Sequence, residues 1–115
     1  MRYFVIAIFK ELGILGEAQL RKIRIRFLST MRNIVAPNET IIEVQAEATV
    51  GDLLGSIATM YGETMAAHLF QQDRKTMRSD ILILINDVDI EVLDGISTRL
   101  SEGDEVTLMP VAHGG

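Results

Sequence analysis

The sequence predicts an α+β domain. Three observations carry this prediction: basic and apolar side chains alternate over residues 22–27, apolar positions recur every three or four residues over 50–61, and five aliphatic residues run from 81 to 85. The first pattern is typical of a half-buried strand, the second of an amphipathic helix and the third of a buried strand. The length of 115 residues allows one domain, or two at most.

The first two strands are expected to form a hairpin. Every second residue from Ile23 to Phe27 is apolar, so one face of this strand should be buried. Residues 33–38 contain a proline and indicate a turn, and residues 40–44 return to sequence rich in β-branched side chains.

A helix is expected to begin after Thr49, because Thr49 and Asp52 have the spacing of an N-terminal capping box. This capping role accounts for Asp52 without a catalytic function. Gly62 is placed to end the helix, and a second, shorter helix is predicted over residues 63–70. His68, near the end of that second helix, is interpreted as structural and not as a metal ligand.

The second half of the chain predicts three further strands after a polar loop at 71–80. The aliphatic run at 81–85 is expected to be a central strand covered on both faces, because it shows no alternation. In order, the remaining elements are expected to be a turn at Asn86-Asp87, a short edge strand at 88–92, a helical turn at 95–100, and a last strand at 105–109 closed by Pro110.

Composition excludes several classes of function. The chain contains no cysteine, so it forms no disulfide, thiolate nucleophile or thiolate metal site. The formal net charge of −5 gives no electrostatic reason to bind nucleic acid, which requires clustered Lys and Arg. Residues 1–30 hold six basic against two acidic side chains, a net charge of +4, and the remaining residues hold five against fourteen, a net charge of −9. The acidic body favours a partner that presents positive charge.

An acidic run, formed by Asp87, Asp89, Glu91 and Asp94, has two interpretations. Such a run can attract a divalent ion, but the sequence does not indicate the oxygen-ligand geometry that an ion requires. We therefore interpret it as a solvated edge that faces a basic partner, and we expect no metal site.

The chain shows no membrane-spanning pattern. The longest apolar stretch near its start, residues 3–9, is too short to cross a bilayer, and no clear secretory cleavage site follows it. We therefore expect a cytoplasmic protein with no membrane partner.

The C-terminal segment is the chemically distinctive feature. After the last predicted strand only residues 111–115 follow, and they end in Gly114-Gly115. Glycine has no Cβ, so a narrow channel of another protein can close around such a tail. The α-carboxylate of Gly115 is ionised at neutral pH and can attack the α-phosphate of ATP to form an acyl adenylate, which a sulfur or amine nucleophile then attacks.

Four segments of the sequence together resemble the MoaD/ThiS family of ubiquitin-like sulfur carriers. They are Thr49-Val50-Gly51-Asp52-Leu53-Leu54, Ile83-Leu84-Ile85-Asn86, the stretch Leu100-Ser101-Glu102-Gly103-Asp104-Glu105-Val106-Thr107-Leu108-Met109-Pro110, and the final Gly114-Gly115. The resemblance covers about residues 22–115. It implies a ubiquitin-like β-grasp fold, a mixed sheet wrapped over one main helix.

The resemblance also implies a function. A ubiquitin-activating-type enzyme would use ATP to adenylate Gly115, and a sulfur donor would convert it to a thiocarboxylate. In MoaD-like members the carrier is the small subunit of molybdopterin synthase, whose large subunit receives the tail. We therefore expect a sulfur carrier of molybdopterin biosynthesis, with no catalytic activity of its own and no permanently bound cofactor. Thiamine-precursor and RNA acceptors remain open.

Two other functions remain open beside the carrier. A ubiquitin-like modifier of archaeal type would form an isopeptide bond between Gly115 and a target lysine. A plain interaction module would use only its acidic surface, and the terminal glycines would then have no role.

The residues that flank the tail are candidates for partner binding. Leu108, Met109 and Pro110 precede the tail and Val111 begins it, and we expect the alternate ones to be exposed as a docking patch. Gly114 would give the tail its flexibility. His113 is either a solvated tail residue or the occupant of a subsite in the activating enzyme.

The sequence departs from the family pattern at three places. Asn86-Asp87 replaces the frequent Asn-Gly turn, which leaves the turn type open, and Leu108-Met109 replaces a pair of aromatics common in MoaD members. Residues 1–21 have no counterpart in the family. The domain is therefore assigned to residues 22–110 with a tail at 111–115. The extension at 1–21 is an added packing element, an oligomerisation arm, or the product of a start codon placed too early.

Overall fold

The computed structural model describes residues 20–35 and 38–111. In chain order the elements are strand β1 (Leu20–Phe27), 3₁₀ helix η2 (Ser29–Asn33), strand β2 (Glu39–Gln45), helix α2 (Val50–Tyr61), helix α3 (Glu63–Leu69), strand β3 (Ile81–Ile85), strand β4 (Val88–Asp89), 3₁₀ helices η3 (Ile90–Val92) and η4 (Gly95–Ser97), and strand β5 (Glu105–Pro110).

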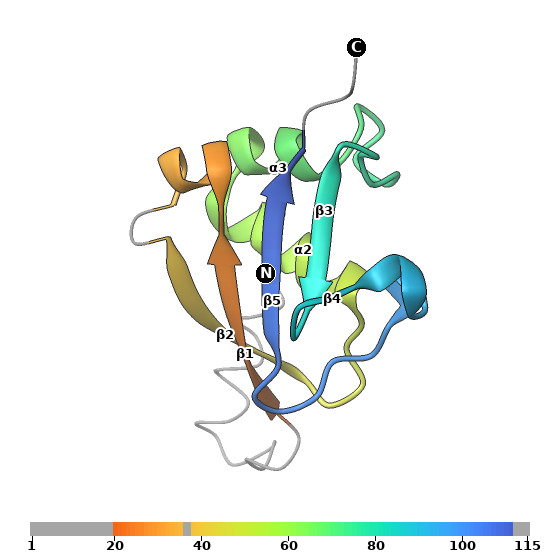
Figure 1. Ribbon diagram of the computed structural model, residues 1–115. Coiled ribbons are helices and arrows are strands. Elements are labelled where there is room, and N and C mark those ends of the chain that lie inside the picture. Colours follow the sequence, from red (N-terminus) through yellow and green to blue (C-terminus); the bar gives the residue numbers. More distant parts are fainter. Residues whose placement is uncertain (1–19, 36–37, 112–115) are drawn as a thin grey trace.

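The five strands form one mixed sheet in the order β2-β1-β5-β3-β4 (Figure 1). The first and last strands of the chain lie side by side and run parallel, with Arg24 opposite Glu105 and Phe27 opposite Leu108. All other pairings are antiparallel. Strand β5 therefore occupies the middle of the sheet, and the chain that follows it leaves from the centre of one sheet end.

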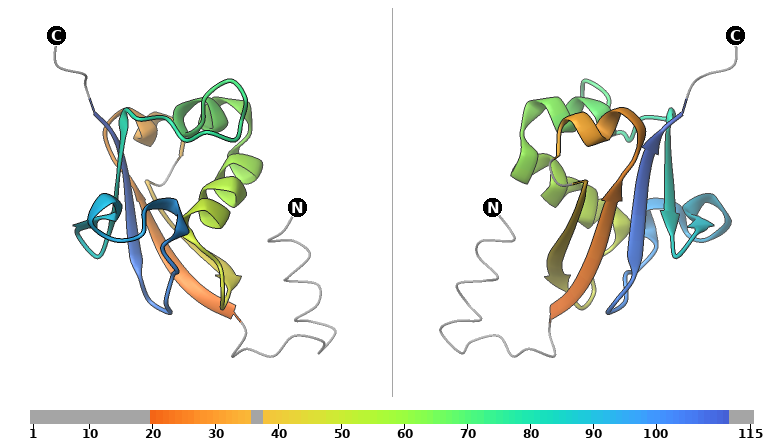
Figure 2. Two further views of the ribbon diagram at one scale, coloured as in Figure 1. Left: turned by 90° about the vertical axis from the view of Figure 1, so that its right-hand side faces the viewer. Right: turned by 60° about the vertical axis from the view of Figure 1, so that its left-hand side comes forward.

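Helices α2 and α3 cover the same face of the sheet, and within residues 20–35 and 38–111 no helix covers the other face (Figure 2). The covered face holds the core, in which Phe27 meets Tyr61 edge to face at a centroid distance of 5.7 Å. Burial of these apolar side chains supplies the main stabilising free energy of the domain. The largest fully buried core residues are Phe27, Ile23, Ile25, Met31, Ile42, Leu53, Leu54, Ile57, Met65, Leu69, Ile83 and Ile90.

The predicted hairpin and the predicted helix starts are confirmed. Strand β1 begins at Leu20, two residues before the expected boundary, and pairs antiparallel with β2. Helix α2 begins with a reciprocal capping box: Thr49 Oγ1 accepts from the backbone N–H of Asp52 at 3.2 Å, and Asp52 Oδ2 accepts from the N–H of Thr49 at 3.0 Å. Gly62 ends this helix with φ of +85°, a conformation that favours glycine.

The prediction for strand β3 requires a correction. As expected, β3 is an interior strand, which lies between β5 and the two-residue strand β4, but it is not covered on both faces. Ile81, Ile83 and Ile85 are buried, whereas Leu82 and Leu84 are only partly buried. The uninterrupted aliphatic run therefore places two leucines on the face that the helices leave uncovered.

Both central residues of the turn after β3 have a left-handed backbone conformation, which settles the turn type that the sequence had left open. Asn86 and Asp87 have φ of +50° and +69°, as a type I′ turn requires at both central positions. The side chain of Asn86 donates to Asp104 Oδ1 at 2.9 Å and accepts from the N–H of Glu105 at 3.0 Å. These bonds tie the turn to the start of β5.

Candidate functional site at the end of β5

The backbone of β5 is fixed by its neighbours up to Val111. Pro110 lies opposite Ile81 in β3, and the N–H of Val111 donates to the carbonyl oxygen of Asp80 at 2.9 Å. This register makes Pro110 and Ile81 a non-hydrogen-bonded pair, so the nitrogen of Pro110 points away from β3. Strand β1 ends at Phe27, before this level, so the missing N–H of Pro110 costs no ladder bond. The predicted tail residues His113, Gly114 and Gly115 lie outside the described residues.

The four residues from Leu108 to Val111 differ in exposure. Leu108 is 0% exposed and belongs to the core, so its expected place in a docking patch is corrected: its side chain is not available on the surface of the domain. Met109 and Pro110 are partly buried, and Val111 is 39% exposed. Alternation along the strand explains the difference, because Leu108 points toward the helices and Met109 toward the uncovered face.

The uncovered face of the sheet continues from Met109. Met109 is the register partner of Leu82, and both are half-buried and apolar, whereas Leu84 lies opposite the buried, polar Thr107. On the β1 side this apolar strip is bordered by Arg24 and Arg26, whose guanidinium groups lie 3.5 and 3.4 Å from Glu105. The face therefore combines an apolar centre, which reaches the end of β5 at Met109, with a border of paired charges on the β1 side.

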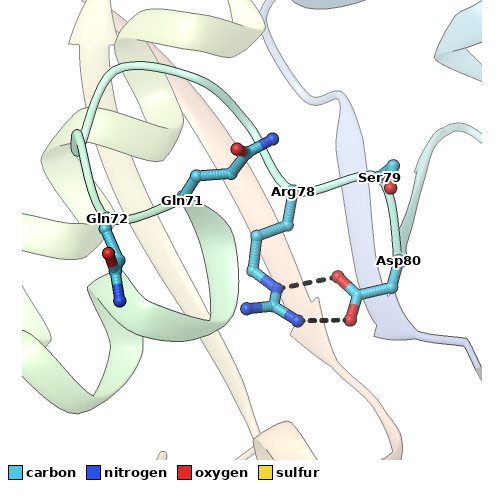
Figure 3. A pocket seen from close by; sticks show the side chains of 5 residues that line it. All are labelled: Gln71, Gln72, Arg78, Ser79 and Asp80. Carbon is cyan, nitrogen blue, oxygen red and sulfur yellow. Dashed lines mark hydrogen bonds and ion pairs between the residues drawn. The ribbon is translucent and has the colours of Figure 1, made fainter.

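A polar hollow lies beside Val111, the first residue of the tail, which we call the tail root. The hollow is between the C-terminal end of α3 and the start of β3 (Figure 3). It has a volume of about 450 Å³ and is lined by Gln71, Gln72, Arg78, Ser79 and Asp80. A second hollow of about 360 Å³ shares Arg78 and Asp80 with the first and reaches Pro110.

Arg78 and Asp80 form a bidentate ion pair between the two hollows. Arg78 donates through Nε to Asp80 Oδ1 at 2.8 Å and through Nη2 to Oδ2 at 2.6 Å (Figure 3). These hydrogen bonds, together with the negative charge of Asp80, raise the pKa of Arg78 above its usual value. The backbone carbonyl of Asp80 thus binds the N–H of Val111, and the carboxylate of Asp80 binds the guanidinium of Arg78.

One carboxylate accepts three hydrogen bonds within the loop that carries Arg78. Asp73 accepts hydrogen bonds from Thr76 Oγ1 at 2.6 Å and from the N–H groups of Lys75 and Thr76 at 2.9 Å. The bonds from Thr76 and then Lys75 lower the pKa of Asp73 from 3.8 to about 2. Sequence reasoning assigned residues 71–80 only as a polar loop and missed the hollow. The one local signal of this hollow in the sequence was the spacing of Arg78 and Asp80, because residues two apart lie on the same side of an extended segment.

His68 borders the second hollow from helix α3. Its Nδ1 lies 2.8 Å from the carbonyl oxygen of Thr64, so this nitrogen donates within the helix. Among residues 20–35 and 38–111, no group of three or more His, Asp or Glu side chains could hold a metal ion. No helix in the same ranges is both long and apolar enough to cross a membrane.

Comparison with known proteins places this architecture in one family. A family model described as Urm1 (Ubiquitin related modifier) matches residues 22–115. Small archaeal modifier protein 3 of Haloferax volcanii is 31% identical over 94 residues, which cover 82% of this chain and 99% of that protein.

Solved structures show the same fold. The solution structure of the Haloferax volcanii HVO 2177 protein has a TM-score of 0.75 and 29% identity, covering 88% of this chain and 92% of that one. The solution structure of Urm1 from Trypanosoma brucei has a TM-score of 0.67 and 24% identity, covering 88% and 100%. The expected β-grasp fold is therefore confirmed, and the chain belongs to the Urm1 family of ubiquitin-like sulfur carriers and modifiers.

Proposed function

We propose that this protein is a sulfur carrier that acts through the carboxylate of Gly115. The observation that carries the proposal is the position of β5. The middle strand is fixed as far as Val111, and the family match extends from there to the final Gly114-Gly115. A rigid sheet thus presents a short segment that begins beside exposed and partly exposed side chains.

The chemistry requires no side chain of this protein. A carboxylate oxygen of Gly115 attacks the α-phosphorus of ATP, and pyrophosphate leaves. A sulfide equivalent from a donor then attacks the acyl carbon, AMP leaves, and a thiocarboxylate remains. ATP is bound by the activating enzyme, so the carrier itself needs no resident cofactor. Sulfur carried on the main chain is compatible with a sequence that contains no cysteine.

A ubiquitin-activating-type enzyme would have to hold the domain while its channel takes the tail. We propose that it contacts Met109, Pro110 and Val111, together with the uncovered sheet face around Leu82. Half-buried apolar side chains bordered by charge are typical of such contacts. Leu108 would contribute only by fixing β5 in the core, and His113 would enter the channel with the tail.

Protein modification is the second candidate, and the names of the matched relatives favour it. The family model is described as a ubiquitin related modifier, and the Haloferax volcanii relative is named a small archaeal modifier. In this case a lysine Nζ of a target attacks the activated carbonyl of Gly115, and an isopeptide bond forms. Adenylation is common to both functions, which differ only in the nucleophile that follows.

Molybdopterin biosynthesis is the finer form of the carrier proposal. It would make the large subunit of molybdopterin synthase the second partner and the molybdopterin precursor the sulfur acceptor. Its test is reconstitution: the thiocarboxylated protein and a cognate large subunit should convert the precursor to molybdopterin. A carrier that is thiocarboxylated but yields no product would limit the proposal to another acceptor.

The central experiment is intact-mass spectrometry after incubation with the cognate activating enzyme, ATP and a sulfur donor. The carrier proposal predicts the replacement of one oxygen by one sulfur in the full chain, and no change in a variant that lacks Gly114 and Gly115. A full chain that never gains sulfur, although the enzyme releases pyrophosphate in its presence, would reject the carrier and leave the modifier.

The modifier needs an adapted mass-spectrometric signature. The last Lys or Arg of the chain is Arg99, so trypsin would leave residues 100–115 attached to a target lysine, and not a short remnant. The variant His113→Arg would leave Gly-Gly instead and would allow standard detection. If neither remnant is found on any lysine of proteins from the source cells, this second function is rejected.

A further inference from the structure

The segment that follows β3 exposes an apolar patch far from the tail root. Four large apolar side chains lie on it with high exposure: Val88 at 41%, Val92 at 74%, Leu93 at 45% and Ile96 at 44%. Exposed apolar side chains gathered in one short segment mark an interaction surface, whereas isolated ones do not. Figure 1 shows this segment as a rounded knob beside β4.

One buried residue and several hydrogen bonds fix the backbone that carries the exposed apolar side chains. Ile90 is 1% exposed and anchors the segment in the core. The side chain of Asp89 accepts from the N–H of Glu91 at 2.9 Å and caps η3, and the N–H of Asp94 donates to Thr98 Oγ1 at 3.0 Å. The backbone of Ile96 lies against Gly51 in the first turn of α2. The exposed side chains therefore stand on a fixed backbone, which reduces the entropy lost on binding.

Acidic residues are interspersed with the exposed apolar residues of this segment, which contains no basic residue. Asp87, Asp89, Glu91 and Asp94 alternate with the apolar residues, and the sequence contains no Lys or Arg between Arg78 and Arg99. In the part of the chain that the structure describes, the ion pairs with Arg24, Arg26, Arg74 and Arg78 all use other carboxylates. The knob therefore presents an apolar centre within a negative potential.

The patch is also separate from the surface proposed for the activating enzyme. Pro110 lies opposite Ile81 at one end of β3, whereas Val88 lies opposite Ile85 at the other end, about 13 Å away along the strand. A second protein could thus bind the knob while an enzyme holds the tail.

We propose that residues 87–96 form a docking surface for a protein segment that presents aliphatic or aromatic side chains flanked by Lys or Arg. The apolar residues supply the affinity and the four carboxylates select the charge of the partner. This proposal does not depend on whether Gly115 carries sulfur or modifies lysines.

The test is an NMR titration of the ¹⁵N-labelled full chain with a helical peptide of about 18 residues that has Leu on one face and Lys on the other. The expected result is saturable binding, with shifts of backbone amides concentrated at 87–97. A peptide with Glu in place of Lys should bind at least about tenfold more weakly, as should a scrambled Leu/Lys peptide.

Substitutions separate the patch from general surface attraction. Val92→Ser and Glu91→Lys alter exposed side chains and should each weaken binding of the Leu/Lys peptide, Val92→Ser by about tenfold. The control is Ile41→Ser, because Ile41 is also exposed, at 59%, but lies on the edge strand β2. Equal affinity of all variants, or shifts confined to the uncovered sheet face, would overturn the proposal. Concentration-dependent shifts of 87–97 without peptide would overturn it in favour of a second copy of this chain.

Discussion

Val111 donates its backbone N–H to the carbonyl oxygen of Asp80, and the carboxylate of the same Asp80 holds Arg78. The root of the tail and the polar hollow beside it are thus tied to a single residue at the start of β3. Under the proposed function, an activating enzyme that takes the tail would also contact the hollow, and Arg78 would give it a side chain to recognise besides the tail itself.

Arg78→Ala should leave stability nearly unchanged and should weaken recognition. Both partners of the ion pair are partly exposed and solvent screens their charges, so the free energy of unfolding should change little. Because the guanidinium lines both hollows, the KM of the activating enzyme for this chain should rise several-fold with kcat unchanged. Arg74→Ala is the control, since Arg74 belongs to the same loop but pairs with Glu63. Pyrophosphate-release kinetics measure both, and equal effects of the two substitutions would contradict a role for the hollow.

Leu108→Ala should mainly lower stability and Met109→Ser should mainly weaken partner binding, although the residues are neighbours. Leu108 is fully buried, so its truncation should lower the free energy of unfolding by about 2–5 kcal/mol, measured by urea denaturation. Met109 faces the uncovered side of the sheet, so its replacement should cost about 1 kcal/mol or less and should weaken binding to the activating enzyme. A large loss of stability from Met109→Ser with unchanged enzyme binding would reject the assignment of that face to the partner.

Thr49→Ala should destabilise the domain by about 1 kcal/mol. The substitution removes the hydroxyl that accepts from the N–H of Asp52 and leaves a helix N-terminus with one unpaired donor. Thermal or urea unfolding measures the change. Thr49→Ser keeps the oxygen and should retain most of the stability, so an equal loss from both substitutions would show that the methyl group matters more than the cap.

Local sequence patterns predicted the elements that local interactions determine. The alternation over 22–27, the capping box at Thr49 and the glycine at 62 each act within a few residues of the chain, and the structure confirms all three. Alternation along β5 likewise puts Leu108 and Met109 on opposite faces of the sheet. Sequence analysis did not predict which of the two is buried, because the face that the helices cover depends on the sheet order.

The features that sequence analysis missed depend on contacts between distant residues. The first hollow forms where residues 71–80 fold back on α3, with the N–H of Arg78 donating to the carbonyl oxygen of Leu69 at 2.9 Å, and the register of β3 and β5 adds Pro110 to the second hollow. The run at 81–85 was expected to be covered on both faces because its composition reports apolar character and not which face of the sheet the helices cover. The exposed patch at 88–96 was hidden for the same reason: apolar residues such as Val92 read as edge-strand residues, and only the 3₁₀ turns point them to solvent.

Asp73 should titrate with a pKa of about 2, well below the 3.8 of an unperturbed carboxyl. Because the folded pKa is the lower one, the hydrogen bonds of Asp73 stabilise the loop fully above about pH 4 and are lost as the pH falls toward 2. The carboxyl-carbon NMR shift measures this titration. Thr76→Val removes the hydroxyl donor and should move the pKa upward, whereas Thr59→Val, which alters another exposed threonine, should not. An unchanged pKa in Thr76→Val would contradict the assigned cause.

Asp87→Gly should stabilise the domain, because Asp87 occupies the left-handed region with φ of +69° in a type I′ turn. Glycine adopts this conformation without the steric cost of a Cβ, so the free energy of unfolding should rise by about 0.5–1 kcal/mol. Asp87→Ala is the matched control: it removes the same carboxylate but keeps a Cβ, so it should give no such gain. Stabilisation by both substitutions would instead identify repulsion among the neighbouring acidic side chains as the cost that Asp87 imposes on the fold.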